Sequence, residues 1–180
     1  MHPRCQEIAD HLDHHRAELH AAVASIPPER HAIAPADGQW SVLAVLEHLV
    51  IVEGRVGKML EKQILDAKAA GAQAETDATP ILPQLKMAMF TDRTRKIKGS
   101  DAVQPRLGPR LDELWQSMDT SRASIKRLLV VADGMRLGNL TMPHPTFGPL
   151  DLYTWFAFIG AHEARHAAQI REIGATVATL

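Results

Sequence analysis

Two histidines occupy positions where a helix would be expected to carry apolar residues facing a core. His162 and His166 lie four residues apart, on a stripe of the last helical segment that otherwise carries Ile159, Ile170 and Ile173. Residues at this spacing share one face of a helix, so both rings can point at one site. A buried polar nitrogen without a partner costs about 1–3 kcal/mol, so the placement needs a reason. Zinc and nickel are among the divalent metals that such a pair commonly binds.

His48 is the best candidate for a third ligand. It lies in the apolar run VLAVLEHLVIV, where Val45 and Val52 share its face at helical spacing. Alone, a histidine there is typical of a core or helix-contact residue. Taken with the pair, it completes a predicted three-histidine metal site. His15, on the apolar stripe of the first helical segment, is an alternative ligand or a hydrogen-bond partner of a ligand.

Three further residues are candidates for catalytic or proton-transfer roles: Glu47, Glu163 and His144. Glu47 and Glu163 each adjoin a ligand in sequence and so point about 100° away from it, which makes a surface charge the simpler interpretation for both. His144 lies between two prolines near the start of the last helix, where it could reach a ligand pocket. A rigid loop residue is the simpler interpretation there.

The segment His162-Glu163-Ala164-Arg165-His166 also matches the zinc-protease pattern H-E-x-x-H, in which the glutamate is the general base. Only 14 residues follow His166, and Glu172 is the sole carboxylate among them, so the downstream third ligand of such proteases has no good source. Proteases also bind peptides along an exposed strand, and the sequence shows no clear strand. The pattern is therefore not taken as a protease signature.

Composition limits the other functions. The 180 residues suffice for one domain spanning the chain, and the 46% hydrophobic and 23% charged residues are ordinary for a globular protein. The net charge is −1, and the short basic stretch at 93–98 is too brief to predict a nucleic-acid surface. No apolar run approaches the about 18 residues that a membrane span needs. A single cysteine, Cys5, in a fraying N-terminus excludes an internal disulfide, and we expect a cytoplasmic protein.

The elements that must position the histidines are helices. Apolar residues recur at spacings of three and four, and prolines or glycines interrupt the pattern at Pro27-Pro28, Gly71, Gly134 and Gly174. Long helices are expected over residues 8–26, 42–70, 111–131 and 149–173, with a short helix over 82–96. The sequence thus predicts an all-α fold, a four-helix bundle with an extra short helix.

Two pairs of segments are recognisable together. They are Gln39-Trp40-Ser41 leading to Leu46-Glu47-His48-Leu49, and, about 100 residues later, HPTFGPL (144–150) leading to HEARHAAQI (162–170). They resemble the DinB-like superfamily, in particular the branch that contains bacillithiol-transferase-like metal-dependent hydrolases. The resemblance covers nearly the whole chain, and it implies a four-helix bundle with a long crossover. It also implies a metal held by one histidine of the second helix and a His-x-x-x-His pair of the last, which fall on His48, His162 and His166.

The resemblance is a weak guide to the reaction, because the family contains thiol-dependent S-transferases, isomerases and uncharacterised proteins. Three histidines leave at least one coordination position open, where a thiol or water would have its pKa lowered. The first hypothesis is therefore an enzyme, an S-transferase or hydrolase, that activates a low-molecular-weight thiol or water against a small electrophile. The second is a non-catalytic, stress-associated protein whose metal is structural. A homodimer that pairs through a helix face is a third alternative.

Overall fold

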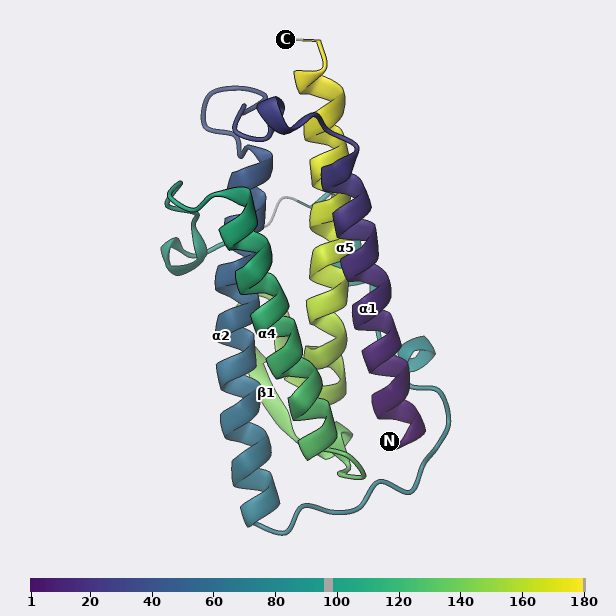
Figure 1. Ribbon diagram of the computed structural model, residues 1–180. Helices are drawn as coiled ribbons and strands as arrows, with labels where there is room; N and C mark the ends of the chain where they lie inside the picture. The colour runs from purple at the N-terminus through teal and green to yellow at the C-terminus, as the bar shows by residue number, and fades with distance from the viewer. Residues whose placement is uncertain (96–98, 180) are drawn as a thin grey trace.

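Four long helices form the body of the protein, in a computed structural model that describes residues 1–95 and 99–179. They are α1 (Pro3–Ala24), α2 (Val42–Ala69), α4 (Leu111–Val131) and α5 (Leu152–Val177). Figure 1 shows α1 and α5 running in one direction, and α2 and α4 in the other. Since α2 and α4 run the same way, the chain between them must travel back along the bundle. The predicted four-helix bundle with a long crossover is confirmed.

Over its described residues, the crossover between α2 and α4 contains only short helical pieces. These are the 3-10 helices η2 (Leu82–Gln84) and η3 (Asp101–Val103) and the single-turn helix α3 (Ala88–Thr91). The predicted helix over 82–96 is therefore broken into η2 and α3, and its last residue, like the rest of 96–98 in the basic stretch, lies outside the described residues. Among those described, no helix is long and apolar enough to cross a membrane.

Side chains at the helix ends fix where α2 and α5 begin. Ser41 accepts a hydrogen bond from the Ala44 amide at 3.3 Å, and Asp151 accepts one from the Thr154 amide at 2.9 Å. Each satisfies a backbone donor that the first helical turn leaves free. Gly71 follows α2 with a φ of +72°, a conformation that favours glycine. These signals set the registers of the two helices that carry the three histidines.

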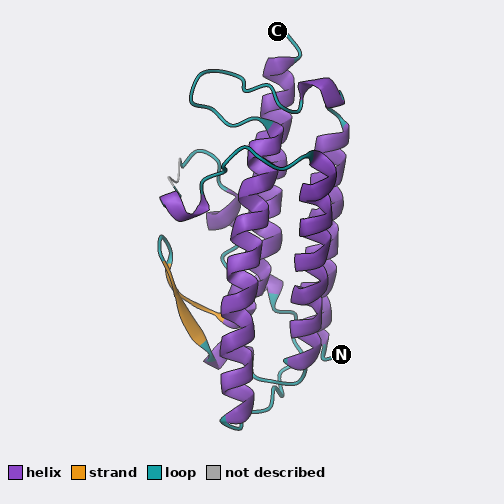
Figure 2. Ribbon diagram, turned by 60° about the vertical axis from the view of Figure 1, so that its left-hand side comes forward, coloured by secondary structure: helices purple, strands orange, loops and turns teal. Residues whose placement is uncertain are grey.

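A β-hairpin precedes α5, which the sequence analysis did not predict. β1 (Thr141–His144) pairs antiparallel with β2 (Gly148–Asp151), and Figure 2 shows the pair beside the bundle. The prediction that the last helix begins near Pro149 was wrong, because Pro149 lies in β2 opposite Pro143. Proline cannot donate to a strand ladder, so it normally argues against a strand. A two-stranded ribbon has free edges on both sides and tolerates it.

Two other predicted boundaries were also wrong. α1 begins at Pro3 rather than Ile8, so Cys5 is fully buried instead of lying in a fraying terminus. α5 continues past Gly174 to Val177. A Cβ at Gly174 would lie 2.8 Å from the Ile26 side chain, so this glycine allows the end of α1 to approach α5 closely.

The core consists of two hydrophobic clusters. One contains Leu12, Val56 and Ile125, and the other contains Leu19, Leu49 and Met118, as representatives of α1, α2 and α4. The two clusters follow each other along the bundle axis. Buried charged side chains from the four long helices lie between them.

Candidate metal centre

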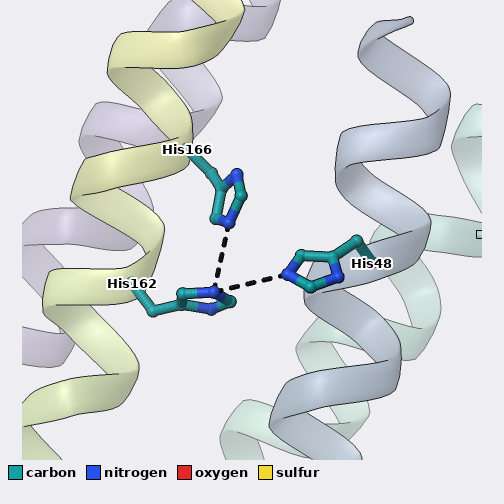
Figure 3. Close-up of side chains that lie close together, drawn as sticks. All are labelled: His48, His162 and His166. Carbon is teal, nitrogen blue, oxygen red and sulfur yellow. Dashed lines mark hydrogen bonds between the residues drawn. The ribbon is translucent and has the colours of Figure 1, made fainter. Parts of the chain in front are cut away.

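The structure brings the three predicted histidines together. His48 projects from α2 toward α5, and His162 and His166 project from successive turns of α5 toward α2, as Figure 3 shows. Antiparallel α2 and α5 therefore supply the site from opposite sides. His48 and His166 are buried, and His162 keeps a partly exposed surface. Their ligand atoms all lie within 4.8 Å of one another.

The distances between the ring nitrogens fit a bound ion. The Nε2 atom of His162 lies 3.4 Å from Nε2 of His48 and 3.1 Å from Nε2 of His166. Nitrogens about 2.0–2.1 Å from a tetrahedral zinc ion lie about 3.3–3.4 Å from one another. A divalent ion could therefore enter among the three nitrogens with only small side-chain movements.

Hydrogen bonds at Nδ1 fix the orientation and the tautomer of two of the three histidines. Nδ1 of His48 lies 2.8 Å from the carbonyl oxygen of Val103, and Nδ1 of His166 lies 2.8 Å from Oε1 of Gln169. Both partners are acceptors, so each Nδ1 carries the proton and each Nε2 keeps a lone pair. Nε2 of His162 can carry at most one hydrogen, and it faces the lone pairs of the other two Nε2 atoms. The three Nε2 atoms therefore present more lone pairs than hydrogens, an arrangement that favours a bound cation.

Burial keeps the three rings uncharged near neutral pH. It lowers the pKa of His48 and holds that of His162 well below its usual value, with the neighbouring His166 and His48 adding to the effect on His162. Burial also lowers the pKa of His166 to about 3, again with a contribution from His48. A metal ion binds the neutral ring, so protons compete weakly for these nitrogens near neutral pH.

Aromatic rings border the histidines on two sides. The centroid of Trp40, just before α2, lies 4.9 Å from that of His48 and 6.4 Å from that of His166. Phe158, one turn before His162 on α5, stacks on its ring with centroids 5.1 Å apart. These rings limit the access of water on those sides and restrict the orientations that the imidazoles can take.

The crossover is fastened on both sides of the site. Glu47, predicted more simply as a surface charge, is buried, and its Oε2 accepts the Leu107 amide at 2.8 Å. Leu107 has a φ of +60°, which is unfavourable for a residue with a side chain, so this bond holds a strained turn. On α5, Arg165 is buried and donates to the carbonyl oxygens of Asp92 and Arg95. Glu47 thus anchors the loop and does not point at the three nitrogens.

Glu163, also predicted more simply as a surface charge, is 1% exposed and belongs to a ring of four buried charges. Its Oε1 accepts from Arg16 Nε at 2.8 Å, and its Oε2 lies 2.8 Å from Arg122 Nη2. Glu53 closes the ring, with contacts of 3.0 Å to Arg16 and 3.3 Å to Arg122. Each of the four long helices supplies one member. Because its carboxylate is bound to two arginines, Glu163 is not free to act as the base of an H-E-x-x-H protease.

The sequence carried a signal for this charged ring that was missed. Arg16, Glu53 and Arg122 each stand four residues after one apolar core residue and three before the next: Leu12 and Leu19, Leu49 and Val56, Met118 and Ile125. These flanking residues belong to the two hydrophobic clusters, so the ring separates one cluster from the other. A charge in the gap of an apolar stripe is a signal for a buried ion pair.

His144 does not join the three histidines. It lies at the end of β1, and its Nδ1 accepts the amides of Thr146 and Phe147 at 3.1 and 3.3 Å. Phe158 stands between it and the site, with ring centroids 5.1 Å from both His144 and His162. Burial lowers the pKa of His144. Its place therefore fits the simpler interpretation, a residue that shapes the hairpin turn.

A second group of ligand-type side chains lies on α1. His14, His15 and Glu18 come within ligand distance of one another, and His15 Nδ1 lies 2.7 Å from Glu18 Oε2. That distance is typical of a hydrogen bond, whereas two ligands of one zinc ion lie about 3.3 Å apart. The side chain of His14 is 66% exposed. The buried group is the better candidate, and His15 does not belong to it.

Comparison with known proteins agrees with this fold. The family model of the DinB superfamily matches residues 11–170, which include all three histidines. The uncharacterized protein YuaE of Bacillus subtilis is 29% identical over 147 residues, which cover 77% of this chain and 80% of YuaE. The crystal structure of TT2238, a four-helix bundle protein, superposes with a TM-score of 0.61 at 21% identity, covering 93% of this chain and 98% of TT2238.

Proposed function

Because the chain belongs to the DinB superfamily, we propose that it is a metal-dependent enzyme in which His48, His162 and His166 hold a divalent ion such as zinc or nickel. The observation that carries the proposal is the meeting of three Nε2 atoms at separations of 3.1 and 3.4 Å. In His48 and His166, the Nδ1–H group also donates a hydrogen bond to an oxygen. Ligand histidines in metalloproteins are commonly oriented in this way.

Three protein ligands favour a catalytic over a structural centre. Structural zinc sites are usually closed by four protein ligands, whereas catalytic sites keep a position for water or substrate. When bound, the ion would supply Lewis-acid chemistry and lower the pKa of a coordinated thiol or water. Of the three histidines, His162 alone is partly exposed. The substrate class that fits is a small electrophile, attacked by a low-molecular-weight thiol or by water, in an S-transfer or hydrolysis reaction.

The protein's own residues would hold and shape this centre. Val103 and Gln169 fix the orientation of two ligand rings, and Trp40 and Phe158 border the site with apolar surface. Glu47 holds the loop that carries Val103 against α2. None of these contacts supplies a proton donor or acceptor directed at a substrate, so the chemistry is assigned to the metal position rather than to a side-chain base.

Metal binding is tested first, by measuring the zinc and nickel content and affinity of the purified full-length protein. We expect one ion per chain, lost in His48→Ala and in His162→Ala. His14→Ala is the matched control, because it removes a histidine of the exposed group on α1 and should leave the stoichiometry unchanged. A wild-type protein that binds neither ion, or a His14→Ala variant that loses it, would refute the assignment.

The reaction is tested on the metal-loaded protein with a panel of small thiols and electrophilic substrates. We expect turnover that requires the metal and disappears in His48→Ala. A protein that binds its metal tightly, melts at a much lower temperature without it and shows no turnover would instead be a non-catalytic metal-binding protein. That outcome would support the metal site but refute the proposal that the protein is an enzyme.

A further inference from the structure

The three histidines differ in how their second ring nitrogen is held. Nδ1 of His48 and Nδ1 of His166 each have an acceptor at 2.8 Å. Nδ1 of His162 has none among the residues that the structure describes, although its Nε2 contacts both other rings. Since ligand histidines nearly always donate their second ring N–H to an oxygen, His162 calls for a partner that the side chains and backbone do not provide.

A small cavity adjoins His162, and neither His48 nor His166 lines it. It has room for about one water molecule. Its lining is apolar at Leu49, Val52, Phe158 and Ile159 and polar at His162, Glu53 and Glu163. A cavity of this size holds water only when polar groups line it, and this one is lined by one histidine and two glutamates.

The carboxylates of Glu53 and Glu163 can accept more hydrogen bonds than they do. Glu163 Oε2 is buried, and its contact with Arg122 is an ion pair at 2.8 Å without hydrogen-bond alignment. Each oxygen of Glu53 accepts one hydrogen bond from an arginine. An ionised carboxylate can accept about four, so both glutamates can take a further donor.

We propose that one water in this cavity accepts the Nδ1–H of His162 and donates its two hydrogens to the Glu53 and Glu163 carboxylates. The charged ring would then be the positioning group for the third ligand of the metal. The water would make three hydrogen bonds, which is usual for buried water. A carboxylate acting on a ligand histidine fixes its tautomer and makes Nε2 a stronger ligand. The proposal rests on the proposed metal site, but the water itself does not require the metal.

The direct test is a crystal structure of the full-length protein at a resolution that places waters, solved with zinc and without it. We expect a water within hydrogen-bonding distance of His162 Nδ1 and of a carboxylate oxygen of Glu53 or Glu163. A dry cavity, or an Nδ1 bonded to a protein group, overturns the proposal. A protein that binds neither zinc nor nickel but holds this water would refute the proposed function alone.

The positioning role is tested by filling the cavity without changing a charge. Val52→Ile adds a methylene group at the cavity wall, and Val56→Ile is the control, one turn further along α2 and outside the cavity. We expect Val52→Ile to weaken zinc binding about 10- to 100-fold, as loss of an outer hydrogen bond does. The control should keep its zinc affinity within a few fold.

A crystal structure of the Val52→Ile variant, at the same resolution, shows whether the water has been expelled. If it has not, Ile159→Phe fills the cavity from the opposite wall. Unchanged zinc affinity in a variant whose cavity is dry would show that the water does not position His162. The unfolding free energy of each metal-free variant is measured in parallel. If a variant loses as much unfolding free energy as it loses zinc-binding free energy, the substitution has caused a general packing defect. That result would also count against the proposal.

Discussion

Two polar layers cross the interior of the bundle at neighbouring levels, and they differ in what they need. The charged ring takes one side chain from each long helix, and its two arginines and two glutamates neutralise one another. The histidine layer comes from α2 and α5 alone and depends on the crossover for the Val103 carbonyl. Its three nitrogens meet as acceptors without a cation of their own.

The charged ring stabilises the fold, whereas the histidine layer is the one proposed to bind a metal. A buried charge is tolerated only when its partners are also inside, so the ring is complete and ties the four helices in one register. The histidines are uncharged, so their burial costs less free energy than burial of a charge. A bound ion would stabilise this layer more than it would the ring. We therefore expect changes to the ring to lower stability first, beside any effect on zinc through the proposed water, and changes to the histidine layer to act chiefly on metal binding.

The largest effect should come from breaking the ring. Glu163→Gln leaves Glu53 as the one buried carboxylate for both Arg16 and Arg122, because Asp119, 3.4 Å from Arg16, is largely exposed. Removing one member of a buried ion pair costs about 3–5 kcal/mol of unfolding free energy. Denaturant titration at neutral pH measures the loss. Glu61→Gln, at an exposed position of α2, should stay within about 0.5 kcal/mol of wild type.

A second variant checks that charge balance is the cause. Combining Glu163→Gln with Arg122→Met removes one charge of each sign and leaves the Arg16–Glu53 pair, which is neutral. The double variant should be more stable than the sum of the two single losses predicts, by about 0.5–3 kcal/mol. Strict additivity would mean that the four charges do not act as one ring.

The histidine layer should respond to metal instead. Zinc at about 100 times its dissociation constant stabilises a protein that binds it only when folded by about 2.7 kcal/mol. We expect this gain in thermal or denaturant unfolding of the wild type, and no gain when His48, His162 and His166 are all replaced by alanine. A metal-free triple variant that has lost more stability than Glu163→Gln would reverse the comparison between the two layers.

The pH dependence of the metal-free protein should also follow the histidine layer. The pKa of His166 falls from 6.5 to about 3 on folding, because burial disfavours the charged ring. Between those values the unfolded chain binds more protons, so stability is present above about pH 6.5 and is lost as the pH falls toward 3. His166 alone should cost about 2 kcal/mol between pH 6.5 and 5. The slope should flatten in His166→Gln, and an unchanged slope would contradict the assignment.

The two layers also differ in how well the sequence predicts them. His162 and His166 stand out because a histidine pair four residues apart on an apolar stripe is unusual, and the long helices follow from periodicity and from caps such as Ser41. The charged ring was missed because arginine and glutamate are common on helix surfaces. Only their partners, contributed by three other helices, make burial possible, and those contacts are not local in sequence.

The hairpin and the crossover were harder to predict for a different reason. Proline at 143 and 149 argues against strands in most settings, and only the isolation of this two-stranded ribbon permits it. The hydrogen bonds from the crossover to His48 and Glu47 span 55 and 60 residues of sequence. No periodic pattern reports such contacts, because they depend on where an irregular segment comes to rest.

The smallest effect on stability should come from the anchor of that crossover. Glu47→Gln replaces the charged acceptor of the Leu107 amide with a neutral one, so the bond is weakened but not lost, and the loss of stability should be at most about 1 kcal/mol. Since this bond helps hold the segment that carries Val103, zinc affinity should nevertheless fall, whereas the charged ring stays intact. Calorimetric titration with zinc, set beside a denaturant curve, measures both. Unchanged zinc affinity would show that the histidine layer does not depend on this anchor. The two layers would then not differ as argued, with the charged ring built from helices alone and the histidine layer completed by the crossover.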